Sequence, residues 1–236
     1  METVSLLGNT ILFRPYVFVF LAAFLFIGIL NHGWERTLVF WFGTWVLAFL
    51  SEYSSTRNGF PYGLYHYTGL TKGKELFISN VPFFDSLSYS FLMYASYCMA
   101  LFTLSPEKQR WKVLILSALY MMMIDVVIDP VALQGERWFL GKIYYYDIPG
   151  AFFGIPITNA LGWGLVGLTA TALYQWIERT SFRPIVHERS WMGVCLYYGV
   201  LIFNLTIAWK IGERGLFMAG CFIYLIPTVL LFLKLF

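Results

Sequence analysis

Long apolar runs alternate with short polar breaks along the 236-residue chain. As a helix, each run is long enough to cross the hydrocarbon core of a bilayer, which is about 30 Å thick. The pattern predicts an all-α, polytopic transmembrane helical bundle of about seven spans, at 15–31, 36–53, 82–104, 112–130, 157–177, 191–209 and 215–234. Two connections are long, at 54–81 and 131–156, and we interpret residues 1–236 as a single membrane domain.

The composition agrees with this interpretation. Hydrophobic residues make up 59% of the chain and charged residues only 12%, whereas soluble domains carry about 25% charged residues. Trp and Tyr are frequent near the ends of the apolar runs, which is typical of the two membrane interfaces. The net charge of +3 includes no basic block, which argues against nucleic acid as a partner. We therefore expect a multi-pass protein of the cell membrane.

The rare polar residues gather at one end of the predicted bundle. In an antiparallel bundle, the end of the second span, the start of the third, the end of the fourth and the start of the fifth lie at the same membrane face. Glu52, Asp85, Asp129 and Asn159 occupy these four places, and both long connections lie there too. We call this the polar end. A polar residue inside a span is costly and generally functional, although Asp85 fits a favourable charge at a helix N-terminus equally well.

Asp125 and Asp129 lie in the otherwise apolar stretch MMMIDVVIDP. Their i, i+4 spacing places both carboxyl groups on one helix face, and Pro130 is expected to end the helix. Because burial and the like charge both disfavour ionisation, we expect one of the two to keep its proton near neutral pH. The alternative is a pair of interface acids that are neutralised by Arg or Lys or hydrogen-bonded to the backbone.

The two long connections add aromatic residues to the polar end. After Glu52, the segment LSEYSSTRNGFPYGLYHY contains Arg57, Tyr62 and Tyr65, and it fits either a lid over a site or an ordinary aromatic interface loop. The second connection contains Trp138.

The start of the fifth span carries an amide and an indole on one face. Asn159 and Trp163 are four residues apart and so share a helix face. A buried amide needs a hydrogen-bonding partner, and the nearest candidates are the acids. The three histidines show neither HxxxH nor HExxH spacing, so no metal site is expected.

Three motifs in this order resemble a known family. They are E-Y-x5-G-F-P-Y-G-x-Y-x-Y from Glu52, D-x3-D-P from Asp125, and F-G-I-P-x-x-N-x-x-G-W from Phe153. Over residues 50–165 the chain resembles the membrane carotenoid hydratase family, which is also described as the carotenoid biosynthesis protein family. Its common forms P-F-G and G-V-P-x-x-N-F are here P-Y-G and G-I-P-x-x-N-A.

The resemblance implies an enzyme that adds water across the terminal C1–C2 double bond of an acyclic carotenoid ψ-end. It implies a carotenoid substrate, the lipid bilayer and other carotenoid enzymes as partners, and no cofactor. Protonation of an alkene needs an acid that is still protonated at neutral pH, and the resulting cation is stabilised by aromatic faces. On this hypothesis one of Asp125 and Asp129 is the acid, and the other or Glu52 deprotonates the water. Asn159 and Arg57 orient the carboxylates, and Tyr62, Tyr65, Trp138 and Trp163 contact the substrate.

Three other classes remain open on the sequence alone. An intramembrane carotenoid cyclase shares the protonation step but captures the cation with an internal alkene. A membrane prenyltransferase needs two aspartate-rich clusters to hold magnesium diphosphate, and only Asp125 to Asp129 comes near. A carotenoid or lipid binder without catalysis would share the fold and the aromatic residues.

Overall fold

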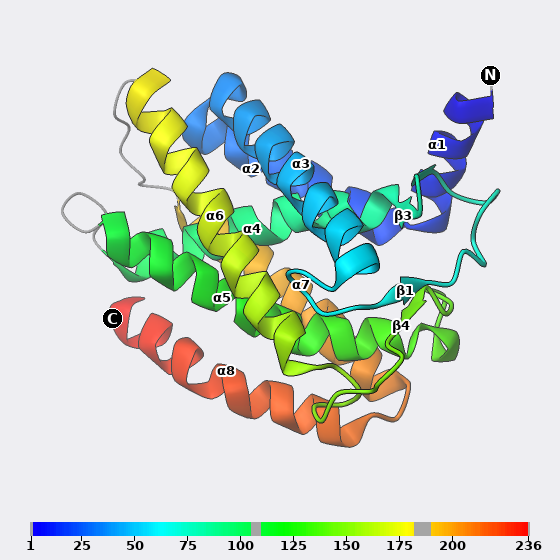
Figure 1. Ribbon diagram of the computed structural model, residues 1–236. Coiled ribbons are helices and arrows are strands. Elements are labelled where there is room, and N and C mark those ends of the chain that lie inside the picture. Colours follow the sequence, from blue (N-terminus) through cyan, green and yellow to red (C-terminus); the bar gives the residue numbers. More distant parts are fainter. Residues whose placement is uncertain (1, 105–109, 182–189, 236) are drawn as a thin grey trace.

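The computed structural model describes residues 2–104, 110–181 and 190–235. Within these ranges eight α-helices follow one another: α1 (Glu2–Phe13), α2 (Pro15–His32), α3 (Trp34–Asn58), α4 (Phe83–Thr103), α5 (Arg110–Leu133), α6 (Ile157–Ser181), α7 (Ser190–Lys210) and α8 (Arg214–Leu235) (Figure 1). Helices α2 to α8 coincide with the seven predicted spans to within a few residues. The predicted all-α membrane bundle is thereby confirmed.

Four helices of the described ranges are long and apolar enough to cross a membrane, namely α2, α5, α7 and α8. The outer face of α8 exposes large apolar side chains such as Phe222, Leu225 and Ile226. Such a surface is stable when lipid rather than water covers it.

Helix α4 is the centre of the bundle, because α2, α3, α5, α6 and α7 all pack against it. Its buried side chains lie on all sides of the helix and include Ser86, Ser90 and Ser96, which are fully buried. Small residues let helices approach closely, and Ser96 satisfies its hydroxyl by donating to the Leu92 carbonyl of its own helix at 2.8 Å. Helix α4 therefore needs less apolar surface than the helices that face lipid.

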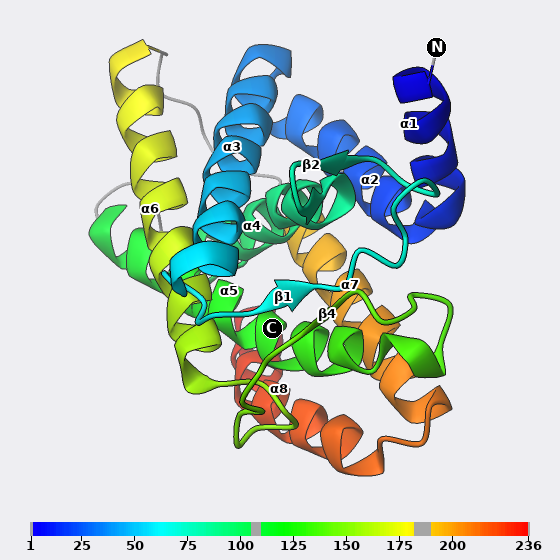
Figure 2. The same cartoon turned by 45° about the vertical axis from the view of Figure 1, so that its right-hand side comes forward.

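The two long connections meet at the polar end. Strand β1 (His66–Tyr67) of the first pairs antiparallel with strand β4 (Tyr144–Tyr145) of the second, with Tyr67 opposite Tyr144 (Figure 2). Strands β2 (Phe77–Ile78) and β3 (Val81–Pro82) form a second short pair, and the 3-10 helix η2 (Gly135–Arg137) follows α5. This pairing brings tyrosines from both connections together.

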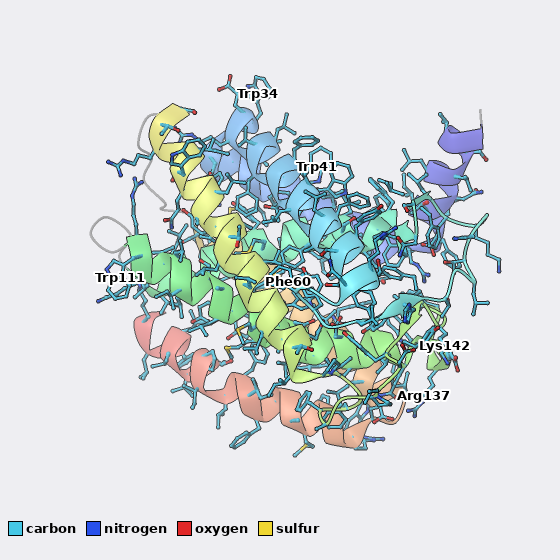
Figure 3. All side chains as sticks on the ribbon, viewed as in Figure 1. Trp34, Trp41, Phe60, Trp111, Arg137 and Lys142 are labelled. Carbon is cyan, nitrogen blue, oxygen red and sulfur yellow. The ribbon has the colours of Figure 1, made fainter. Side chains whose placement is uncertain are left out.

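Figure 3 shows how the two ends of the bundle differ. Trp34 and Trp111 project at one end, whereas Arg137 and Lys142 lie on the second connection at the other. Trp34 and Trp111 are 62% and 63% exposed, as expected for indoles at a membrane interface rather than in a protein core.

The structure corrects two details of the sequence analysis. Helix α1 was not expected, and it is separated from α2 at Arg14 because Pro15 begins α2 and lacks the amide hydrogen that a continuous helix requires. The prediction that Pro130 ends the fourth span was wrong, because α5 continues to Leu133. The added turn buries Val131 completely against α7 and α8, and this packing outweighs the local preference of the residue before proline.

Candidate functional site

A cavity opens at the polar end between the helices and the two connections. It encloses about 930 Å³ of space free of atoms, counting the part open to solvent. Helices α2 to α7 and both connections contribute to its wall. Acidic and aromatic side chains dominate the lining, which includes Tyr16, Phe20, Glu52, Tyr62, Tyr65, Tyr67, Asp85, Phe91, Asp129, Trp138, Tyr144, Tyr146, Asn159, Trp163 and Phe203.

One amide joins two carboxyl groups in the wall of this cavity. The Nδ2 group of Asn159 donates to Asp125 Oδ2 at 2.9 Å and to Asp129 Oδ2 at 2.6 Å. Its Oδ1 atom accepts from the Tyr146 hydroxyl at 3.1 Å. Asp129 lines the cavity, whereas Asp125 is only 1% exposed and lies behind the amide. The predicted pairing of Asn159 with the acids is thus seen in the structure.

Local sequence explains why these three side chains meet. Asp125 and Asp129 lie one turn apart on α5, so both point to the same side. Pro156 precedes α6, and its backbone carbonyl accepts from the backbone N–H of Asn159 at 3.0 Å. This hydrogen bond sets Asn159 in the first turn of α6. The glycines that follow allow α6 to approach its neighbours: a Cβ on Gly164 would lie 2.5 Å from Met122 Sδ of α5, and one on Gly162 would lie 2.7 Å from the Pro61 carbonyl oxygen.

A second pair of acids lies at the same cavity. Glu52 accepts from the Tyr67 hydroxyl at 3.3 Å, and Tyr67 in turn lies 3.4 Å from the Tyr65 hydroxyl. Asp85, at the start of α4, also lines the cavity and lies near Tyr67, whose pKa its charge raises. Three carboxyl groups therefore line one mostly aromatic space, and a fourth, that of Asp125, lies behind Asn159.

The tyrosines of the connections serve as hydrogen-bond donors. Burial raises the pKa of Tyr67 well above its usual value, and the charges of Asp85 and Glu52 raise it further. Burial likewise raises the pKa of Tyr144, whose hydroxyl donates to the Asp129 backbone carbonyl at 3.1 Å. These phenols keep their protons at physiological pH and can orient acceptors without taking up charge.

The structure brings most of the predicted site residues together. Those that line the cavity are Glu52, Tyr62, Tyr65, Asp129, Trp138, Asn159 and Trp163. Asp125 joins them through Asn159.

Arg57 is the exception, because it does not orient the acids as expected. Its guanidinium is exposed, donates to Asn80 Oδ1 at 2.9 Å and to the Tyr53 carbonyl at 2.8 Å, and lies over the Tyr53 ring. Arg57 sits at the C-terminal end of α3, where its side chain reaches back along its own helix and away from the cavity.

Several lining residues were missed from the sequence. Tyr67, Tyr144 and Tyr146 reach the cavity because β1 pairs with β4, and nothing in the sequence fixes that pairing. Asp85 was left undecided, although its place at the start of the third span was a usable signal. In the described part of the chain, no group of three or more His, Cys, Asp or Glu side chains is arranged to hold a metal ion.

Taken together, the fold and the cavity define an integral membrane protein with a cluster of buried carboxyl groups at an aromatic cavity. Comparison with known proteins is consistent with this class. The family model described as "Carotenoid biosynthesis protein" matches residues 13–227, and the chain belongs to this family.

A curated relative is also similar to the chain. It is the bisanhydrobacterioruberin hydratase of Haloarcula japonica, with 30% identity over 155 residues. The matched stretch covers 65% of this chain and 50% of the relative, so the chain matches about half the length of that protein. No solved structure matches the chain significantly.

Proposed function

We propose that this protein is a carotenoid hydratase of the cell membrane, an enzyme that adds water across the terminal C1–C2 double bond of an acyclic carotenoid ψ-end to give a tertiary hydroxyl. The observation that carries the proposal is the Asp125–Asn159–Asp129 cluster, which holds two carboxyl groups in the wall of an aromatic cavity. The family and the hydratase relative support a carotenoid as the substrate class.

Asp129 is the candidate general acid, because it lines the cavity while Asp125 lies behind Asn159. Two carboxyl groups held by one amide in an apolar site cannot both ionise at low cost, so the pair retains a proton to give. In the proposed first step, Asp129 transfers this proton to C2. The π electrons of the double bond form the new C–H bond, and C1 becomes a tertiary cation.

Glu52 is the candidate base. Glu52 lines the cavity from α3, whereas Asp129 lies on α5, and the Glu52 carboxyl group accepts from the neutral Tyr67 hydroxyl. A water molecule attacks C1 through an oxygen lone pair, and Glu52 accepts the proton that this water loses. The net change is the addition of one water molecule, and a proton exchanged with solvent returns Asp129 and Glu52 to their starting states.

The aromatic lining suits the intermediate. Tyr62 and Trp163 line the cavity with ring centroids 6.2 Å apart, and Tyr89 stacks behind Trp163 at 4.9 Å. The faces of such rings carry partial negative charge and stabilise a nearby cation.

The test is expression in a bacterium that accumulates lycopene, followed by chromatography and mass spectrometry of the pigments. The wild-type protein should give a product heavier by one water. Asp125→Asn and Asp129→Asn should reach the membrane in normal amount and form at least about a hundredfold less of it, in the range lost when a general acid is removed. Asp147→Asn is the matched control, because Asp147 is an exposed loop acid paired with His66.

The pigment profile separates the alternatives. A product of unchanged mass with altered absorption would identify a cyclase and contradict the hydratase proposal. Full hydration by both Asp125→Asn and Asp129→Asn would contradict the assigned chemistry while leaving the substrate class intact.

A further inference from the structure

The cavity has two chemically different ends. Asp129 and Glu52 line the end formed by α3, α5 and α6, and Asp125 lies behind Asn159 at this end. Asp85, at the start of α4, also lines the cavity and lies close enough to Tyr16 of the other end to interact with it electrostatically. The other end lies between α2, α4 and α7 and is lined by Tyr16, Phe20, Phe91, Val200 and Phe203. These five residues carry no carboxyl group, and the proposed reaction assigns them no role.

Its aromatic rings form a continuous series. Phe20 of α2 lies 5.7 Å from Phe91 of α4 and 5.8 Å from Phe203 of α7, measured between ring centroids. Tyr16, one turn before Phe20, stacks on Phe203 at 5.1 Å with an interplanar angle of 19°. We call these four residues the aromatic arm. It connects three helices that are distant in sequence, and none of its rings is fully buried except that of Phe91.

The arm offers few groups to a polar ligand, and within its four side chains the Tyr16 hydroxyl is the polar one. The lining amide Asn204 uses its Nδ2 group within α7, where it donates to the Val200 carbonyl at 2.9 Å. Trp138, which lies 6.2 Å from Tyr16, likewise donates its indole N–H to the Val131 carbonyl at 3.1 Å. An occupant of the arm is therefore bound mainly by apolar and ring contacts, which favour a flat, extended hydrocarbon.

We propose that the aromatic arm is the binding subsite for the conjugated polyene chain, and that it orients the substrate with one terminal double bond at Asp129 and the rest of the chain between α2, α4 and α7. This inference rests on the proposed function for the identity of the reacting end. It assigns Phe20 and Phe203 as specificity-determining residues for long acyclic polyenes. Because the cavity has one acid end and one arm, a symmetric polyene can place only one of its two termini at Asp129 at a time. Its second terminus reacts in a separate binding event.

Binding can be measured apart from catalysis. Lycopene is achiral, so a visible circular dichroism band appears only when the protein holds it in a fixed asymmetric environment. The protein is expressed in lycopene-accumulating cells in an Asp129→Asn background, so that substrate is not consumed, and is then purified with its pigment. Bound lycopene per protein and the induced circular dichroism are the two readouts.

Phe20→Ala and Phe203→Ala should each lower bound lycopene about tenfold or more, since each removes a large apolar contact. Phe26→Ala is the matched control, because Phe26 lies on the same helix α2 but is 62% exposed, and it should bind like the parent. Phe20→Leu keeps most of the apolar volume but loses the ring, so it should bind less lycopene than the parent and more than Phe20→Ala. Thermal unfolding of each purified variant shows whether it is folded.

The outcomes separate this inference from the proposed reaction. Unchanged pigment content and circular dichroism in both Phe20→Ala and Phe203→Ala would show that the aromatic arm is not the polyene-binding subsite, whatever the wild-type protein does to lycopene. A wild-type protein that binds lycopene through the arm but forms no hydroxylated product would instead overturn the proposed hydration and leave the arm in place.

Discussion

At the scale of single residues, Asn159 organises the site. Both hydrogens of its amide go to carboxyl groups and its oxygen accepts from Tyr146. It is 2% exposed, so water cannot readily replace these bonds when the amide is removed. A buried acceptor that loses its donor costs about 1–3 kcal/mol, so this residue couples the stability of the fold to the positions of the two carboxyl groups.

We expect Asn159→Ala to lower the free energy of unfolding by about 1–3 kcal/mol, because two buried carboxyl groups lose their shared donor. Unfolding in mixed detergent micelles measures this change. In an Asp129→Ala background the same substitution should cost less, since one of the two acceptors is gone.

Asn204→Ala is the control for this double-mutant cycle. Its amide donates to its own helix at Val200, so its effect should be the same with or without Asp129. Equal penalties for Asn159→Ala in both backgrounds would show that the amide and Asp129 do not interact.

At the scale of elements, the connections over the cavity are held by one fully buried ion pair. Arg14, between α1 and α2, donates to Glu75 of the first connection at 3.3 and 3.4 Å and to the Leu140 carbonyl of the second at 2.7 Å. Neither charged side chain has any exposed surface. The Arg14 guanidinium also lies 4.7 Å from the ring centroid of Phe84, which lines the cavity. One side chain therefore fixes both connections.

Arg14→Met should destabilise the protein by about 3–5 kcal/mol, because it leaves the Glu75 charge buried without a partner. Adding Glu75→Leu should recover much of this loss, since the uncompensated charge is then removed. Thermal unfolding of the purified variants measures both effects.

Lys142→Met provides the comparison for this pair. Lys142 and Glu136 form an ion pair whose side chains are 46% and 61% exposed, and such pairs contribute about 0–1 kcal/mol. A loss in Arg14→Met no larger than that in Lys142→Met would mean that the buried pair does not hold the connections.

At the scale of the whole molecule, the seven long helices α2 to α8 of the described ranges divide into two groups. The four that meet the length and hydropathy expected of a span are α2, α5, α7 and α8. Helices α3, α4 and α6 carry more polar residues, and these include Glu52, Asp85 and Asn159 of the cavity. Inside a membrane, polar side chains are stable where protein rather than lipid surrounds them.

Cys221 tests this arrangement. It is exposed on α8, seven residues after the helix begins at Arg214, which places it about 10 Å along the helix axis. If lipid covers this face, a membrane-impermeant maleimide should not label Cys221 in intact membranes but should label it after denaturation. Peptide mass spectrometry reads each cysteine separately.

Ile148→Cys is the positive control, because Ile148 is 83% exposed on the second connection. Membranes opened to both sides should label it fully. Rapid labelling of Cys221 under the same conditions would show that this face of α8 is in contact with water.

The sequence by itself determined the membrane class, the seven long helices and the gathering of acids at one end. These follow from local properties: an apolar run of sufficient length forms a helix in lipid, and an antiparallel bundle fixes which ends share a face. The i, i+4 spacing of Asp125 and Asp129 also fixed their common direction, and the need of a buried amide for partners pointed to Asn159.

Only the tertiary structure decided how the connections close over the cavity and which of their side chains line it together with the acids. The β1–β4 pairing places Tyr67 beside Glu52, and the Arg14–Glu75 pair joins segments 61 residues apart. The aromatic arm likewise depends on α2, α4 and α7 packing together. Arg57 shows the converse, because its nearness to Glu52 in sequence did not bring it to the acids. Such contacts depend on side-chain partners from distant segments, and helical periodicity carries no information about which distant segments pack together.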